Sequence, residues 1–358
     1  MTYSVNFANY TIGKEAYKNV NEVCRQYGTK ALLIGGKLAL EAGKEKLLQA
    51  LAEGENPITI VDTVLFGEDC TYAGMEKLAA HAKKCGAEMI FGMGGGKALD
   101  TAKGTAEKCG LPVFTFPTIA ATCAATTALS VVYKEDGNFD SFYFYEKPAR
   151  HCFINTEIIA AAPECYLRAG IGDTLGKYFE CHFAARGDRL THSSALGREI
   201  SNMCYLPLRE YGEEALKECR ENQAGEALEQ AVLANIVSTG LVSLLVLDEY
   251  NGAIAHSVYY GLVLLPGFDE ENLHGDVVAY GVLVQLMIDG EAEKAREMKE
   301  FLEKLGIRTT LAEMGAPLER EALTAVLKEI VTGPDMEHIP YEVTEDMVYD
   351  ALCKVEEL

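Results

Sequence analysis

The stretch Met89-Ile90-Phe91-Gly92-Met93-Gly94-Gly95-Gly96-Lys97 decides the fold class. Its first three residues predict a buried strand, Gly92 to Gly96 predict a loop, and Lys97 to Cys109 predict a helix. Glycines at such a junction let the backbone approach a pyrophosphate, and the free N–H groups and dipole of the following helix favour negative charge. Neither common phosphate fingerprint is matched in full, because Ala98 follows Lys97 and Leu99 stands where a third glycine is expected. A tight structural turn is therefore the alternative to a phosphate-binding loop.

The sequence on both sides of this stretch repeats the order strand, helix, strand. Apolar runs predict further strands at residues 31–34, 57–65 and 112–116, and helical spacing predicts helices at 38–51 and 72–85. This order is typical of a parallel sheet that is covered by helices on both faces.

The pattern changes after about residue 155. Few strand signals follow, and helical spacing predicts the ranges 166–185, 191–210, 224–247, 277–286 and 291–305. We therefore predict two domains: an α/β dinucleotide-binding domain over residues 1–158 and an all-helical domain over residues 159–358.

Composition argues against several function classes. The 358 residues carry a formal net charge of −22, and so acidic a surface disfavours nucleic acid and anionic membranes as partners. The 11 cysteines include no C-x-x-C pair, which favours a reducing compartment over a disulfide framework. Residues 1–6 show no signal-peptide pattern, and the richest apolar run, Ile236 to Leu247, is too short to span a membrane. We expect a cytoplasmic protein that acts on small molecules.

A second loop follows the strand predicted at 112–116. Residues 117–127, with the sequence Pro-Thr-Ile-Ala-Ala-Thr-Cys-Ala-Ala-Thr-Thr, are small, rich in hydroxyl groups and uncharged. Open α/β sheets bind ligands at the carboxyl ends of their strands, so this loop can lie along a cofactor. An ordinary polar loop is the alternative.

Asp173, His256 and His274 are the candidate metal ligands. Two neutral imidazoles and one carboxylate make a three-ligand site with an open position, which suits catalytic zinc and also ferrous iron. Taken singly, Asp173 is explained as a helix N-cap or first-turn residue, and each histidine as a buried core residue. Spacing alone does not choose between these interpretations.

The order of these motifs resembles the iron-containing (group III) alcohol dehydrogenase superfamily, most closely its glycerol dehydrogenase-like branch. The matching stretches span most of the chain and are residues 94–103, 117–120, 128–133, 169–173, 255–256 and 273–281. The resemblance implies a Rossmann-like N-terminal domain and an all-α C-terminal domain, the fold that dehydroquinate synthase also has. It further implies that Asp173, His256 and His274 bind the metal.

The same resemblance implies which residues contact NAD or NADP. The positions at the pyrophosphate and ribose are Gly94, Gly95, Gly96, Lys97 and Asp100. The positions along the rest of the cofactor are Thr118, Thr122, Thr127, Leu129 and Tyr133.

Two departures from the family pattern bear on the metal and the cofactor. Iron-type relatives carry a fourth ligand, a histidine, four residues after the aspartate, where this chain has Lys177. A three-ligand zinc site is therefore expected, with Fe²⁺ as the alternative. Relatives that use NAD tend to carry an acid after the first strand, whereas this chain has Gly36 followed by Lys37, a pattern that can admit the 2′-phosphate of NADP.

Two further departures bear on the substrate and on proton transfer. Glycerol dehydrogenases usually have aspartate at the position of Cys123, and its absence favours an anionic substrate whose carboxylate can pair with Lys177. The runs around these two residues resemble the hydroxycarboxylate dehydrogenase subgroup, which interconverts 2-oxo and 2-hydroxy acids. Glycerol or another small diol is the alternative substrate. Tyr259 stands three residues after His256, where many relatives carry a second histidine, so no proton relay is assigned.

The predicted function is NAD(P)-linked interconversion of a small alcohol and its carbonyl compound, with the metal as Lewis acid. By analogy with relatives, we expect a homo-oligomer. Two other classes stay open. One is a lyase of the dehydroquinate synthase type, whose basic phosphate-binding motif is not found here. The other is a non-catalytic binding protein.

Overall fold

The computed structural model describes residues 4–54 and 56–358, so the first three positions of the N-terminal stretch 1–6 lie outside it. The chain forms two compact units, one made of Met1–Pro163 with Glu218–Glu229 and the other of Glu164–Lys217 with Gln230–Leu358. Within the first unit, the Cys219 thiol donates to the carbonyl oxygens of Ala160 and Ala162, each 3.7 Å away. The predicted domain boundary at residue 158 did not include residues 218–229 in the first unit.

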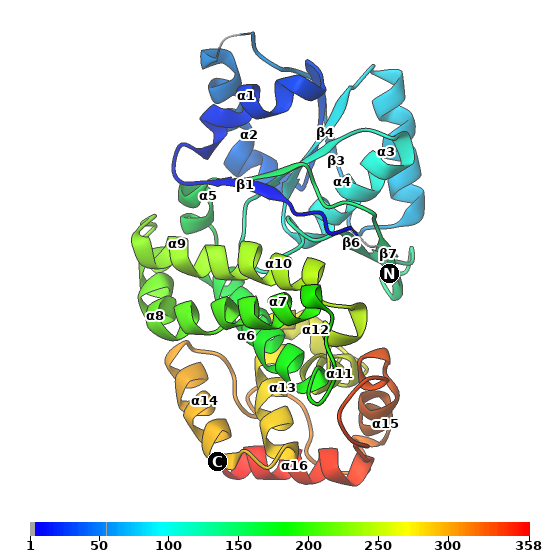
Figure 1. The fold of residues 1–358 in the computed structure, drawn as a ribbon, viewed down its shortest axis with the longest axis vertical. Coiled ribbons are helices and arrows are strands. Elements are labelled where there is room, and N and C mark those ends of the chain that lie inside the picture. Colours follow the sequence, from blue (N-terminus) through cyan, green and yellow to red (C-terminus); the bar gives the residue numbers. More distant parts are fainter. Residues whose placement is uncertain (1–3, 55) are drawn as a thin grey trace. The chain divides into compact units, whose positions relative to one another are not determined.

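The first unit is built on a six-stranded sheet in the order β1-β8-β5-β4-β2-β3, in which every pairing is parallel (Figure 1). The strands are β1 (Asn9–Ile12), β2 (Lys30–Gly35), β3 (Thr59–Leu65), β4 (Met89–Gly94), β5 (Val113–Pro117) and β8 (His151–Ile154). A separate antiparallel pair is formed by β6 (Leu129–Tyr133) and β7 (Phe139–Phe144). The predicted parallel α/β sheet is confirmed, whereas β1, β6, β7 and β8 were not predicted.

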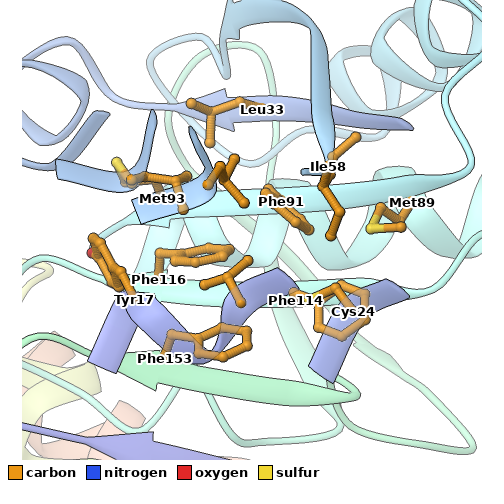
Figure 2. Packing of buried hydrophobic residues seen from close by; sticks show 14 of the residues in the cluster. Tyr17, Cys24, Leu33, Ile58, Met89, Phe91, Met93, Phe114, Phe116 and Phe153 are labelled. Atoms are coloured by element: carbon orange, nitrogen blue, oxygen red, sulfur yellow. The ribbon is translucent and has the colours of Figure 1, made fainter. Parts of the chain in front are cut away.

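Helices cover both faces of the sheet because its central strands are apolar on both sides. On one face, Leu33 and Phe91 pack with Tyr17, Phe114 and Phe116 (Figure 2). On the other face, alternate residues of the same strands pack against the helices that follow β3 and β4. The helices of this unit are α1 (Val20–Cys24), α2 (Lys37–Glu53), α3 (Tyr72–Lys84), α4 (Gly96–Cys109) and α5 (Thr156–Ala160).

The junction between β4 and α4 is tighter than predicted. The strand continues to Gly94 and the helix begins at Gly96, so the predicted five-residue loop Gly92–Gly96 is wrong. Gly94 has a φ of +153°, which a residue with a side chain rarely adopts. Because the helix begins at Gly96, Asp100 is its fifth residue and does not lie in the first turn.

The second unit is helical, and no strand follows Ile154 within the described residues. Its principal helix, α13 (His274–Ile288), is buried over most of its length, and α6 (Glu164–Ala184) and α11 (Ile254–Leu262) pack against it. The prediction of Asp173 as a helix start is wrong, because α6 begins nine residues earlier. The remaining helices are α7 (His192–Ile200), α8 (Leu206–Arg220), α9 (Glu226–Val232), α10 (Thr239–Leu245), α12 (Phe268–Glu271), α14 (Ala292–Lys304), α15 (Thr324–Thr332) and α16 (Glu345–Glu357).

One helical run in the described part of the chain, Glu226–Leu245, is long and apolar enough to cross a membrane by length and composition. The apolar run Ile236 to Leu247, which is too short by itself to span a membrane, overlaps the second half of this longer run. In the structure 61% of the run is buried, and the core helix of a globular protein passes the same test.

Candidate metal centre

Three predicted ligands meet in the second unit, each supplied by a different helix. Oδ1 of Asp173 on α6 lies 3.4 Å from Nε2 of His256 on α11 and 3.4 Å from Nε2 of His274 on α13. One ligand atom from each residue lies within 4.8 Å of the other two. Atoms bound at about 2.0–2.1 Å to a tetrahedral zinc lie about 3.4 Å apart, so both distances from Asp173 fit donors to one ion.

Close contacts between helix backbones bring these side chains together. A Cβ on Gly172, next to Asp173, would lie 2.2 Å from the carbonyl oxygen of Gly275, next to His274. A Cβ on Gly281 would lie 2.4 Å from the carbonyl oxygen of Ala255, next to His256. Since α13 touches α6 and α11 without intervening side chains at these positions, the glycines set the separation of the three ligands.

Glu180 on α6 is fully buried and contacts Nδ1 of His256, the ring nitrogen that does not face Asp173. Its Oε2 lies 2.5 Å from Nδ1 of His256, and its Oε1 accepts hydrogen bonds from the backbone N–H groups of Ala253 and His256. Burial lowers the pKa of His256, but the carboxylates of Glu180 and Asp173 outweigh it and raise that pKa to about 10. The centre therefore has the negative potential that suits a cation.

Lys177 lies one turn after Asp173 on α6, yet its ammonium group is bonded elsewhere. It donates to the carbonyl oxygen of Asn251 at 2.5 Å and to its side-chain Oδ1 at 3.1 Å. Lys177 also interacts electrostatically with Glu180 and Asp335. With neutral histidines, the carboxylates of Asp173 and Glu180 outnumber the ammonium group of Lys177, so the centre keeps the net negative charge that suits a cation.

His274 forms the open side of the centre, since 34% of its side chain is exposed, against 14% for His256. The ring of Tyr259 meets the ring of His274 edge to face, with 4.3 Å between centroids. Two residues after His274, Asp276 accepts both hydrogen bonds of a forked contact from Arg168 on α6. The sequence reasoning missed Glu180, Asn251, Asp335 and Arg168, although the seven-residue spacing between Asp173 and Glu180 places both on one helix face.

The predicted cofactor residues lie in the first unit, where the glycine turn meets the loop 117–127. A Cβ on Gly95 would lie 2.7 Å from Cδ1 of Ile119, and one on Gly96 would lie 3.4 Å from Oγ1 of Thr122. The N–H of Thr118 donates to the carbonyl oxygen of Gly94. The structure therefore brings the two predicted cofactor loops into contact.

Other predicted cofactor residues are engaged within the protein. Lys97 pairs with Asp69, and its ammonium nitrogen lies 4.9 Å from the ring centroid of Tyr133. Asp100 is buried and accepts a hydrogen bond from the N–H of Val131, so its carboxylate is engaged by the protein rather than left free for a ribose.

The remaining predicted residues of the first unit occupy three places. Gly36 and Lys37 lie at the start of α2, Thr127 and Leu129 contact the ammonium group of Lys103, and Cys123 lies partly buried in the loop 117–127 and forms no disulfide within the described residues. Lys103 was not predicted.

Comparison with known proteins identifies the family. A family profile described as iron-containing alcohol dehydrogenase matches residues 8–152. Glycolaldehyde reductase from Halobacterium salinarum is 31% identical over 358 residues, which cover 98% of this chain and 96% of the relative. This chain belongs to the iron-containing alcohol dehydrogenase family. The resemblance inferred from the sequence is thereby confirmed.

Two further relatives of the family carry other substrate names. Hydroxycarboxylate dehydrogenase A of Escherichia coli (strain K12) is 33% identical over 331 residues, which cover 92% of this chain and 90% of the relative. The crystal structure of glycerol dehydrogenase from Schizosaccharomyces pombe superimposes with a TM-score of 0.88 at 28% identity, over 99% of this chain and 91% of that one. The chain is therefore an oxidoreductase, a metal-dependent alcohol or polyol dehydrogenase, and these comparisons support neither the lyase nor the non-catalytic alternative.

Proposed function

We propose that this protein is a zinc-dependent, NAD(P)-linked dehydrogenase that interconverts a small alcohol and its carbonyl compound. The observation that carries the proposal is the convergence of Asp173, His256 and His274: Oδ1 of Asp173 lies 3.4 Å from Nε2 of each histidine, and the three ligand atoms lie within 4.8 Å of one another. These three residues would hold the ion, which would keep a position open for the substrate oxygen.

Zinc is favoured over iron by the surroundings of Lys177. An ammonium group cannot bind a metal, and this one donates both of its described hydrogen bonds to Asn251. No fourth protein ligand is then supplied from the position where iron-type relatives carry a histidine. Fe²⁺ remains the alternative ion, since two imidazoles and a carboxylate also suit it.

The proposed dinucleotide site is the amino-terminal end of α4 with the glycine turn before it. The helix offers unpaired N–H groups and the positive end of its dipole, which suit a pyrophosphate, and Gly94 has the φ of +153° that the turn before the helix requires. No carboxylate stands directly after β2, where Gly36 is the N-cap of α2 and Lys37 is its first residue, so we propose NADP(H) as the preferred cofactor.

The chemistry divides between bound groups and the chain. A bound divalent ion supplies Lewis acidity to the substrate oxygen, and a bound nicotinamide supplies or accepts the hydride. The chain's own residues prepare the site: Asp173, His256 and His274 each place one ligand atom within 4.8 Å of the other two, and Glu180 holds the His256 ring. Their fixed geometry means that little reorganisation is needed when charge develops on the substrate oxygen.

A 2-hydroxy acid and 2-oxo acid pair is our first candidate substrate, because Cys123 leaves the loop 117–127 without a carboxylate. Glycerol or another small diol is the second candidate. The observation favouring it is that the Lys177 ammonium is held by Asn251, which leaves a substrate carboxylate without that partner. The relatives named glycerol dehydrogenase and glycolaldehyde reductase also support the second candidate.

The deciding experiment measures oxidation of NADH and NADPH by zinc-loaded protein with 2-oxo acids, glycolaldehyde and dihydroxyacetone side by side. Faster turnover of a 2-oxo acid, with a raised KM for it alone in Lys177→Met, supports the first candidate. Faster turnover of dihydroxyacetone, or equal losses with all substrates in Lys177→Met, overturns it in favour of the second. Cys123→Asp is expected to shift the preference toward the diol.

We also propose a cytoplasmic location and a homo-oligomeric state, with small molecules as the only other partners. None of the 11 cysteines forms a disulfide within the described residues, as is usual in a reducing compartment. The oligomer rests on analogy with relatives, and light scattering of the purified protein tests it.

A further inference from the structure

We propose that Glu180 is the positioning residue of the metal centre, whose buried carboxylate keeps the proton of His256 on Nδ1 and leaves Nε2 free to bind the ion. The inference deepens the proposed function and rests on it. It assigns a role to a residue that no sequence motif singled out.

Both oxygens of Glu180 are directed to one short segment, the start of α11. Oε1 accepts from the N–H of Ala253 at 2.8 Å and from the N–H of His256 at 2.7 Å. These are the N-cap residue and the third residue of α11, whose N–H groups have no partner within their own helix. No side chain of α11 caps this end of the helix. The carboxylate of Glu180, which comes from α6, therefore acts as the cap.

The other oxygen, Oε2, lies 2.5 Å from Nδ1 of His256. An ionised carboxylate can only accept, so Nδ1 must be the donor. In a neutral ring the lone pair is then on Nε2, the atom that lies 3.4 Å from Oδ1 of Asp173. Carboxylates behind metal-binding histidines fix both the tautomer and the orientation of the ring in this way.

The carboxylate is compensated on its own helix. Lys177 lies one turn before Glu180, interacts with it electrostatically and donates to both oxygens of Asn251. Lys177 and Glu180 together hold the segment from Asn251 to His256 against α6. His274 has a different support, the ring of Tyr259, so the proposal is specific to His256.

The test compares Glu180→Gln with a matched removal of charge, Asp335→Asn. In Glu180→Gln an NH₂ group replaces one carboxylate oxygen. If this NH₂ group faces Nδ1 of His256, it donates to Nδ1, and the ring proton has to move to Nε2. If it faces the backbone instead, it meets the two N–H donors of Ala253 and His256 and can accept from neither. Asp335 interacts electrostatically with His256, but no hydrogen bond joins the two in the described part of the chain. Asp335→Asn therefore removes a nearby charge without changing the tautomer.

We expect Zn²⁺ affinity, measured by competition with a chromophoric chelator, to fall about 10- to 100-fold in Glu180→Gln. The loss in Asp335→Asn should be several-fold smaller. The visible absorption of the Co²⁺-loaded protein should change in Glu180→Gln, because this spectrum reports ligand geometry rather than fold stability. Equal losses in the two variants, or an unchanged affinity and spectrum in Glu180→Gln, overturn the proposal.

A measurement on the zinc-loaded wild type keeps the test valid if Glu180→Gln fails to fold. Long-range ¹⁵N–¹H NMR of the imidazoles should show His256 with a proton on Nδ1 and the ion on Nε2. The opposite arrangement overturns the proposal. If the wild type binds no zinc and turns over no substrate, the proposed function itself fails, whereas failure of the Glu180 tests alone leaves that function standing.

Discussion

The ammonium nitrogen of Lys103 lies 2.9 Å from Oδ1 of Asp100, and both side chains are buried in the first unit. Lys103 also donates to the carbonyl oxygens of Ala124 and Leu129 and to Oγ1 of Thr127. This one side chain therefore anchors the loop 117–127 and the start of β6 to α4, next to the proposed dinucleotide site.

Lys103→Met should destabilise the protein strongly. The substitution leaves the Asp100 carboxylate and three other acceptors buried without their cation, which typically costs about 3–5 kcal/mol. Urea unfolding measures the loss, and a titration with NADPH should show weaker binding because the loop is released. Lys108→Met is the control, since Lys108 pairs with exposed Glu76 at 3.5 Å and should contribute less than about 1 kcal/mol. Similar losses in both variants contradict the anchoring role.

Gly275→Ala should separate α13 from α6 and disrupt the metal centre. The added Cβ would lie 1.8 Å from the carbonyl oxygen of Ala169, so a helix backbone has to move. We expect at least a tenfold loss of Zn²⁺ affinity together with a lower unfolding temperature. Gly212→Ala is the control, because its Cβ would lie 3.4 Å from the nearest atom and alanine favours the helix by about 1 kcal/mol. Normal zinc binding by Gly275→Ala would show that the contact does not set the ligand spacing.

Chelation of the metal should lower the unfolding temperature of the wild type. Zinc at about 100 times its Kd adds about 2.7 kcal/mol to stability, which corresponds to about 5–10 °C for a unit of this size. Differential scanning calorimetry before and after chelation measures the shift. Asp173→Asn should show no such shift and should lose at least about 1000-fold in kcat/KM. A zinc-dependent shift that survives in Asp173→Asn places the ion elsewhere.

Stability should fall as the pH drops from about 6.5 to 4 because of His151. Burial lowers the pKa of this histidine to about 4, while Oγ1 of Thr11 lies 2.8 Å from its Nε2. Between these pH values the unfolded chain binds a proton that the folded chain does not, so stability rises with pH and the full contribution is about 3 kcal/mol. Urea unfolding across this range tests the slope. His151→Gln should flatten it, and an equally steep slope in the variant assigns the effect to other groups.

Gly36→Asp should change the cofactor preference toward NADH. Gly36 has an ordinary φ of −77°, and a Cβ there would lie 3.4 Å from Cε1 of Phe66, so a side chain fits. The new carboxylate can bind ribose hydroxyls and repels a 2′-phosphate. We expect the ratio of kcat/KM for NADH over NADPH to rise at least tenfold. A wild type that already prefers NADH contradicts our interpretation of Gly36 and Lys37.

The central strands β2, β4 and β5 could be predicted because each is mostly apolar and almost wholly buried, with Lys30 and Thr115 as the polar exceptions. The sequence did not reveal β1, because it has four residues and Asn9 and Tyr10 are exposed. The strands β6 and β7 were hidden by a pattern in which Phe139 and Phe144 face solvent.

The metal site could be predicted only through the family resemblance. Spacing placed Asp173 at a helix start, whereas it lies within α6. The role of Glu180 depends on the packing of α11 against α6, which no local pattern of the sequence encodes. Gly172 and Gly275 likewise matter only because of their contact across two helices.

The return of residues 218–229 to the first unit affects how this enzyme can be dissected. A gene fragment that ends at residue 163 would encode the complete parallel sheet and still lack the partner that Cys219 provides to Ala160 and Ala162. A fragment that starts at residue 164 would contain residues 218–229 without the part of the first unit against which they pack. Dinucleotide binding and metal binding are therefore better separated by point substitutions in the intact polypeptide than by truncation.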